Sequence, residues 1–360
     1  MNRRNAAFSL LELMIAMAIV MVVLYAAINF FIISVRQYKV QTKITETNLE
    51  GILGLELFRQ DLESLGFGLP WNNLVAYTER TGVHADIVAL TDSPNAPRAV
   101  LSVNDPAFTF NNSDYLVIKS ARVGMKEAAG KWTTLTQANV KRTWSQENLA
   151  NTDYVIVLAL GTTDANRRSL VTSGTFDTQY NNTAGFVPVE PYSANIVYGI
   201  DDVGTGLVRP FNRAEYYIDS TPPVPSHCAT NTGVLVKAVV EHDANGTTPM
   251  LLPLLDCVAD LQVVYGLDAD ADPATPLVWS NNISLLAADA IRAQLQEVRV
   301  HILAQVGQRD NSYTYPYDNV TVGSEGGGRS FDFTTSGITG FRNYRWRVYN
   351  IAVKPKNLAQ

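Results

Sequence analysis

The chain opens with an unbroken run of apolar residues. Residues 8–35 contain one charged side chain, Glu12, which is the only charge between Arg4 and Arg36. At about 1.5 Å per residue, a helix over this run covers about 42 Å, enough to cross the hydrocarbon core of a bilayer. The pattern therefore predicts a membrane-spanning helix that carries one carboxylate near its start.

Beyond Arg36 the apolar residues form a stripe at three- and four-residue steps, which predicts an amphipathic helix. The stripe consists of Leu49, Ile52, Leu53, Leu55, Phe58, Leu62 and Leu65. Because no proline occurs from Phe8 to Leu69, we expect one helix over residues 8–67, about 90 Å long at 1.5 Å per residue. Its second half should pack under a globular domain, and Gly66, Gly68 and Pro70 should end it.

From Trp71 onward, short apolar runs alternate with Asn, Thr, Gly and Pro, which predicts β structure over residues 68–360. The expected strands are Asp86–Leu90, Tyr115–Ser120, Tyr154–Leu160, Ala214–Ile218, Val234–Val240, Val258–Tyr265, Val298–Gln305 and Tyr344–Val353. One helix is expected at Leu285–Leu295, and residues 104–185 read as a loop-rich insertion. The predicted fold class is α+β, with a long N-terminal helix followed by an antiparallel β-rich head domain.

Composition narrows the function classes. With 46% hydrophobic and 17% charged residues the chain should fold, and a net charge of −6 disfavours nucleic acid as a partner. We find no GxSxG, P-loop or HExxH motif and no zinc-type Cys/His spacing. The four histidines, His84, His227, His242 and His301, are scattered and are expected in loops or on the surface. The sequence therefore does not predict an enzyme and predicts no resident cofactor.

Charged residues at the extreme N-terminus predict the orientation of the chain in the membrane. Arg3 and Arg4 precede the apolar run and should remain in the cytoplasm, which places the head domain outside it. A secretory signal peptide has its small-residue cleavage site after the apolar core. Here Ala6 and Ala7 come before that core. Any processing site therefore differs from that of a secretory signal peptide.

A basic leader, then Ala7, then Phe8-Ser9-Leu10-Leu11-Glu12 resembles the leader of type IV pilins and type II secretion pseudopilins. Members usually carry Gly where this chain has Ala7. The resemblance implies that residues 1–7 are a leader, that prepilin peptidase cuts between Ala7 and Phe8, and that the new amine of Phe8 is methylated. It also implies that Glu12 pairs with the N-terminal amine of a neighbouring subunit, which makes a carboxylate tolerable in an apolar layer. The competing interpretation is a plain signal anchor with a stray Glu.

Three further segments resemble the PilW-type minor pilins: LFRQDLESLGFG at 57–68, LLDCVADLQVVYGLDADAD at 254–272 and RNYRWRVYNIAVKPKNL at 342–358. This resemblance implies a minor pilin that acts in pilus assembly as a tip or priming subunit. Its partners would be other minor and major pilins, prepilin peptidase, the pilus assembly platform and the inner membrane. The head would lie in the periplasm before assembly and in the pilus, at the cell surface, afterwards.

Two alternatives remain at the level of the sequence. One is a type II secretion pseudopilin, which shares the leader. The other is a tip subunit that acts as an adhesin or DNA receptor through the loops of residues 104–185.

The head contains three groups of residues that could form a disulfide, a metal site or a nucleic-acid site. Cys228 and Cys257 form an even pair in a domain expected to face an oxidising compartment, which predicts a disulfide. Asp268, Asp270 and Asp272 alternate as calcium ligands do, with Asn281 or Asn282 nearby, but a solvated acidic turn is the favoured interpretation. The basic and aromatic residues of 342–356 match an ordinary half-buried strand better than a nucleic-acid site.

Overall fold

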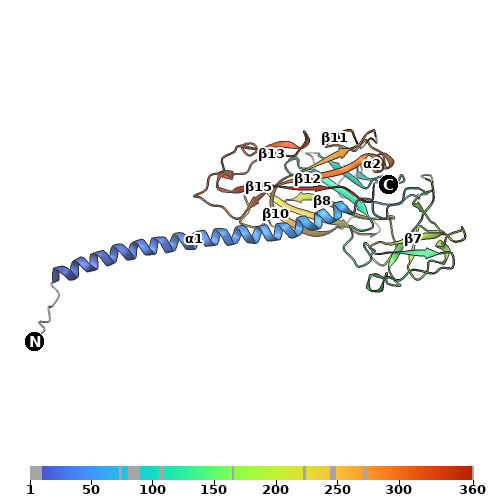
Figure 1. Ribbon diagram of the computed structural model, residues 1–360, viewed down its shortest axis with the longest axis horizontal. Coiled ribbons are helices and arrows are strands. Elements are labelled where there is room, and N and C mark those ends of the chain that lie inside the picture. Colours follow the sequence, from blue (N-terminus) through green and yellow to red (C-terminus); the bar gives the residue numbers. More distant parts are fainter. Residues whose placement is uncertain are drawn as a thin grey trace, which may run out of the picture.

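The computed structural model describes residues 10–72, 75–79, 90–104, 109–163, 166–221, 224–243, 249–270, 272 and 274–358. One long helix, α1 (Leu10–Glu63), leads into a β-rich head, and its N-terminal half extends away from that head (Figure 1). The turn after α1 contains Gly66 and Gly68, both at positive φ (74° and 70°). Glycine adopts this backbone conformation with less steric strain than any other residue. The predicted α+β fold class, with the apolar helix first, is confirmed.

The head is built on an eight-stranded antiparallel sheet in the order β1-β2-β8-β9-β10-β12-β15, with β11 also paired to β10. Its strands are β1 (Val100–Val103), β2 (Tyr115–Ser120), β8 (Asn212–Asp219), β9 (Gly233–Val240), β10 (Pro249–Leu267), β11 (Val278–Ser280), β12 (Leu295–Val306) and β15 (Arg345–Val353). The short helix α2 (Ala288–Gln294) precedes β12. The sheet gives α1 a broad surface on which to pack.

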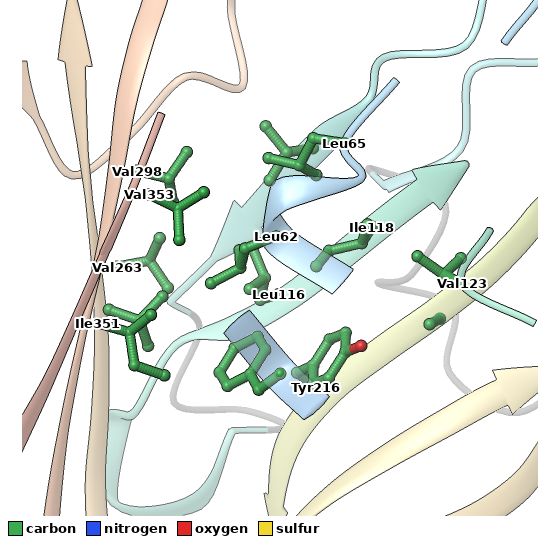
Figure 2. Packing of buried hydrophobic residues seen from close by; sticks show 14 of the residues in the cluster. Leu62, Leu65, Leu116, Ile118, Val123, Tyr216, Val263, Val298, Ile351 and Val353 are labelled. Carbon is green, nitrogen blue, oxygen red and sulfur yellow. The ribbon is translucent and has the colours of Figure 1, made fainter. Parts of the chain in front are cut away.

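The main core lies between α1 and one face of this sheet. Phe58, Leu62 and Leu65 from the end of the helix are fully buried against strand residues such as Leu116 and Val263 (Figure 2). Phe58 also stacks on Tyr216, with ring centroids 4.3 Å apart. Burial of such side chains is the main source of stability for a helix docked on a sheet.

The opposite face of the sheet is covered as well. The hairpin β13 (Asn319–Val322) and β14 (Arg329–Asp332) packs an aromatic cluster over β10, β12 and β15, built around Phe333 and Trp346. At the other end of the sheet, Leu90 joins Leu101, Tyr115 and Val117 in a smaller apolar cluster. Both faces of the large sheet are therefore buried.

A second, smaller sheet lies beyond the C-terminal end of α1, where β7 is labelled in Figure 1. It comprises β3 (Trp132–Thr136), β4 (Tyr154–Ala159), β5 (Ser169–Leu170), β6 (Asp177–Gln179) and β7 (Ala194–Gly199). In the connections that the structure describes, short 3-10 helices include Phe110–Asn112, Ser145–Glu147, Ala184–Phe186 and Phe341–Asn343. Residues 104–185, expected to be loop-rich, thus contain β2 of the large sheet and four strands of the small one.

Strand predictions succeeded where apolar residues are dense. The expected strands that match are β2, β4, β8, β9, β12 and β15, whereas residues 86–89 of the expected Asp86–Leu90 strand lie outside the described part of the chain. β10 starts nine residues earlier than expected, because Pro253 lies at an irregularity of the β9–β10 ladder and so does not end the strand. The short or polar strands β1, β3, β7, β13 and β14 were missed.

Candidate assembly site

The first half of α1 presents apolar side chains to the outside. The segment Leu10–Thr45 reaches a mean hydropathy of 2.6 over its most apolar 18 residues and is the one helix, within the described residues, long and apolar enough to cross a membrane. Its exposed side chains include Leu13, Ile19, Leu24, Phe30 and Ile33. Glu12 is exposed in the first turn, and the predicted processing residues Ala7 and Phe8 lie outside the described residues. This half buries its surface only when lipid or another molecule covers it.

The second half of α1 contacts the head through a stripe that differs from the predicted one. Ile52 and Leu53 were expected on the buried stripe and are exposed instead, while Gly51 and Gly54 face the sheet. The reason is a close backbone approach: a Cβ atom on Gly54 would lie 1.9 Å from the carbonyl oxygen of Leu254. Only glycine fits a helix that comes this close to a bulged strand.

An ion pair also joins α1 to the sheet. The Lys237 Nζ atom lies 2.7 Å from Asp61 Oδ2, and the Tyr216 hydroxyl donates a hydrogen bond to the same oxygen. Burial raises the pKa of Asp61 above its ordinary value, although the Lys237 ammonium and Tyr216 hydroxyl oppose that shift. The pair lines a cleft of about 710 Å³ whose wall also includes Arg122 and Lys356.

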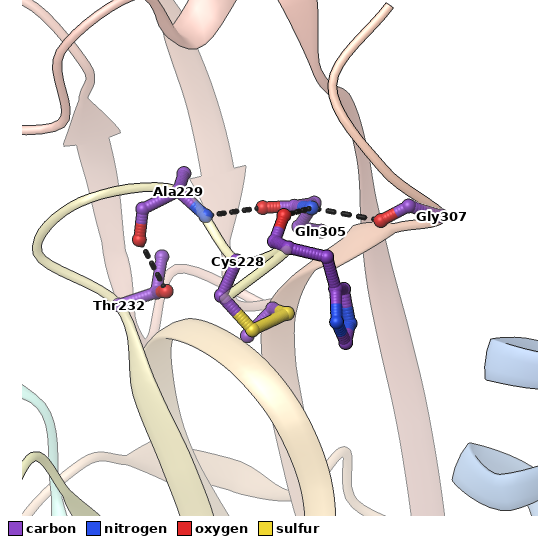
Figure 3. Close-up of a disulfide and its surroundings, with 7 residues drawn as sticks. Cys228, Ala229, Thr232, Gln305 and Gly307 are labelled. Atoms are coloured by element: carbon purple, nitrogen blue, oxygen red, sulfur yellow. Dashed lines mark hydrogen bonds between the residues drawn. A yellow bond between two sulfur atoms is a disulfide. The ribbon is translucent and has the colours of Figure 1, made fainter. Parts of the chain in front are cut away.

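Cys228 and Cys257 are joined by a disulfide, as predicted from the sequence. Cys257 lies in the bulged part of β10 at positive φ (56°), beside the segment that meets Gly54. The Gln305 side chain accepts a hydrogen bond from the Ala229 amide at 2.7 Å and donates one to the Gly307 carbonyl at 2.8 Å (Figure 3). The bond and these contacts fasten the bulge to β12.

Among the described residues, one group of three side chains with ligand atoms close enough to hold a metal consists of His227 and the two disulfide cysteines. Its sulfurs are bonded to each other, so they are not thiolate ligands. The triplet Asp268, Asp270 and Asp272 is not brought together in this way. Asp270 instead accepts a hydrogen bond from the Thr275 hydroxyl at 2.8 Å, which lowers the pKa of Asp270 below its ordinary value.

The C-terminal strand β15 has the expected alternation. Trp346 lies in the aromatic cluster on one face, while Arg345 is 2.8 Å from Asp310 and Arg347 covers the ring of Tyr349. The expectation of a loop or surface position was wrong for His301, which is buried within β12, while His242 lies in the connection after β9 and is also buried. His301 Nδ1 lies 2.7 Å from the Asn350 side chain on the neighbouring strand, so its ring is part of the sheet packing.

A buried ionic cluster under the loop segments before β1 was not anticipated. Lys119 on β2 lies 2.6 Å from Glu79 and 2.5 Å from Asp92, and Arg213 on β8 lies 2.8 Å from Glu79. Burial opposes ionisation of Asp92, but the Lys119 ammonium and the Arg98 hydrogen bonds outweigh it, so the pKa of Asp92 lies below its ordinary value. Sequence alternation identified these strands but gave no sign that their charged face is buried.

Comparisons with known proteins bear on the N-terminal segment. A family model described as the prokaryotic N-terminal methylation motif matches residues 2–28, a range that includes Glu12. A search of curated proteins finds no match. Among solved structures, a type IV-like pilin from Thermus thermophilus, TTHA1219, is similar at 10% identity and a TM-score of 0.32, over 86% of this chain and 97% of that chain. The N-terminal segment thus matches a methylation motif and continues into the exposed apolar helix.

Proposed function

We propose that this type IV pilin-like protein is a minor pilin of the PilW type, which takes part in pilus assembly as a filament tip or priming subunit. The observation that carries the proposal is the methylation motif over residues 2–28, placed at the start of the exposed apolar helix. In this proposal prepilin peptidase cuts between Ala7 and Phe8 and methylates the new amine. The leader of residues 1–7 then stays in the cytoplasm.

The two halves of α1 suit a protein that moves from a membrane to a filament. Before assembly, residues 8–35 are inserted in the inner membrane and the head lies in the periplasm. The same apolar surface is then covered by the helices of other pilins, which replace lipid without exposing the side chains to water. The disulfide between Cys228 and Cys257 supports an oxidising location for the head.

Glu12 sets the axial position of the subunit in this proposal. A carboxylate in an apolar layer is costly unless an opposite charge meets it there. The methylated amine of Phe8 in a neighbouring minor or major pilin supplies that charge. The assembly platform adds subunits from the membrane, and a helix one turn out of position would lose the pairing.

The test is the variant Glu12→Val with Glu12→Asp as the matched control. Glu12→Val removes the charge but keeps an apolar helix, so we expect cleavage and membrane insertion without piliation. Glu12→Asp keeps the charge and should retain most of the piliation. Mass spectrometry of the mature N-terminus reports processing, and electron microscopy with sheared-pilus immunoblots reports assembly.

Normal piliation in Glu12→Val would refute the role of Glu12 in setting the position. An uncleaved N-terminus in the wild-type chain, from cells that contain prepilin peptidase, would contradict the proposed processing at Ala7.

A further inference from the structure

A buried cluster of charged side chains surrounds Lys119, on the face of the large sheet away from α1. Lys119 on β2 stands directly opposite Arg213 on β8, and both side chains are buried. Glu79 and Asp92 reach this face from the two segments that precede β1. The Lys119 Nζ atom is 2.5 Å from Asp92 Oδ2 and 2.6 Å from Glu79 Oε2, so one amine contacts two carboxyl groups.

Lys119 and Glu79 are shielded from solvent, whereas Asp92 lies between them and a surface cleft of about 610 Å³ that Asp92 and Arg98 line. The Lys119 Nζ atom lies over the ring of Phe211, 5.6 Å from its centroid, and Tyr77 packs edge-on against that ring at 5.5 Å. Burial, with the nearby charges of Glu79 and Asp92, raises the pKa of Tyr77 well above its ordinary value. The amine and the carboxyl groups therefore face each other beside aromatic rings, and the cleft beside Asp92 gives the released water a way out.

The cluster contains three basic and three acidic side chains: Lys119, Arg98, Arg213, Glu79, Asp92 and Glu215. Buried ions are tolerated when charge is balanced in this way. Loss of one amine and one carboxylate together would leave two arginines and two glutamates, which is again a balanced set. A covalent bond between Lys119 and Asp92 thus leaves no buried charge unpaired.

We propose that Lys119 and Asp92 condense to form an intramolecular isopeptide bond, with Glu79 relaying protons. Glu79 passes one proton from the Lys119 ammonium to Asp92 Oδ2, and the free amine then attacks Cγ of the resulting neutral carboxyl group. Glu79 passes a second proton from the attacking nitrogen to Oδ2. The new Nζ–Cγ bond forms and the Cγ–Oδ2 bond breaks. Of the three ammonium protons, one stays on the amide nitrogen and two leave with Oδ2 as water. Glu79 ends the reaction in its initial state.

The contacts of Asp92 suit this reaction. Arg98 Nε donates a hydrogen bond to Asp92 Oδ1 at 2.5 Å, so negative charge that develops on that oxygen during the attack is stabilised. Glu79 Oε1 accepts a hydrogen bond from the Asp92 amide at 2.6 Å, which holds the relay carboxyl beside the reacting pair. Fixed neighbours in contact react far faster than free ones, because little orientational freedom is left to lose.

The bond would tie a non-strand segment to the sheet. Residues 91–98 have no ladder of their own, and the ion pair of Asp92 with Lys119 holds them against β2. The isopeptide bond converts that polar contact into a permanent one, on the face of the sheet opposite the attachment of α1. The head would then contain two covalent cross-links, since the disulfide fastens the β10 bulge.

The experiment is intact-mass spectrometry of the full chain purified in detergent, followed by tryptic mapping under reducing conditions. The full sequence mass is calculated for reduced cysteines and for the N-terminus that the tryptic map finds. We expect the wild-type mass, measured after reduction, to be one water below this value. Trypsin should fail to cleave after Lys119, which gives a linked peptide pair of residues 81–98 and 99–122. Tandem spectra of this pair distinguish the isopeptide bond from a succinimide, which also loses water.

Three variants sharpen the result. Lys119→Arg keeps the charge and should have the full sequence mass. Glu79→Gln removes the relay and should leave most of the chain unlinked. Asp92→Asn should converge on the wild-type final mass, because ammonia leaves in place of water; this variant keeps the test decisive if Lys119→Arg does not fold.

A wild-type chain with full sequence mass and normal cleavage after Lys119 would overturn the proposal, as would water loss that persists in Lys119→Arg. Complete linkage in Glu79→Gln would overturn the relay role of Glu79.

Discussion

The two halves of α1 belong to one continuous helix but bury their side chains in different ways. In the first half, residues such as Leu24 and Phe30 are exposed in the isolated chain. In the second half, Phe58, Leu62 and Leu65 are completely buried by strands of the head. The first half therefore depends on lipid or other subunits for burial, whereas the second half is stabilised within its own chain.

This difference explains why the second half of α1 has stricter sequence requirements than the first. Lipid and helical neighbours accept any apolar surface, so the first half needs little beyond hydrophobicity and Glu12. The sheet has a fixed shape, so the second half needs glycine at position 54 and an acid at Asp61 opposite Lys237. Substitutions in the two halves should therefore differ in their effect on the stability of the head.

The largest effect is expected for Phe58→Ala. This change leaves a cavity beside Tyr216 and removes a stacked ring pair, so the free energy of unfolding of the head should fall by about 3–5 kcal/mol. The matched control is Phe30→Ala, which removes the same atoms from the exposed half. It should leave head unfolding unchanged when thermal unfolding of the full chain in detergent is followed by near-UV circular dichroism. Equal destabilisation by both variants would break the distinction between the halves.

A smaller loss is expected for Lys237→Met. The substitution leaves the Asp61 carboxyl buried without its cation, so the free energy of unfolding should fall by about 3 kcal/mol. This value is at the lower end of the range for broken buried pairs, because the adjoining cleft gives Asp61 some access to water. The double variant Asp61→Leu with Lys237→Met should recover most of that loss, since no buried charge remains. Urea unfolding of the detergent-solubilised chain measures the free energy of unfolding of the single and the double variant. A double variant no more stable than Lys237→Met would show that the pair contributes more than charge compensation.

The smallest effect is expected for Gly54→Ala. The added methyl group would meet the Leu254 backbone and force α1 away from β10, which costs about 2 kcal/mol after the better helix propensity of alanine is counted. Gly51→Ala is the matched control, because its Cβ would meet only the flexible end of the Leu255 side chain at 2.9 Å. We expect Gly51→Ala to be neutral or slightly stabilising in the same unfolding assay. If Gly51→Ala were destabilised more than Gly54→Ala, the close approach of the α1 backbone to Leu254 would be contradicted.

The sequence predicted some parts of this structure well because the relevant signals are local. The absence of proline and the glycines after Leu65 gave the long helix, and dense apolar runs gave β2, β9 and β12. Strands such as β3 and β13 were missed because short polar segments become strands only when a neighbour pairs with them. The buried Lys119 cluster was missed for a similar reason: alternation marks a charged face but does not say what covers it.

The sequence by itself determined the N-terminal motif, the exposed apolar helix and the pairing of Cys228 with Cys257, because each depends on residue type and order along the chain. Only the tertiary structure decided which helix face meets the head and that Asp61 and Lys119 are buried among partners distant in sequence. Those contacts join residues that no local pattern relates, and their energies depend on distance and burial, which exist only after the chain has folded.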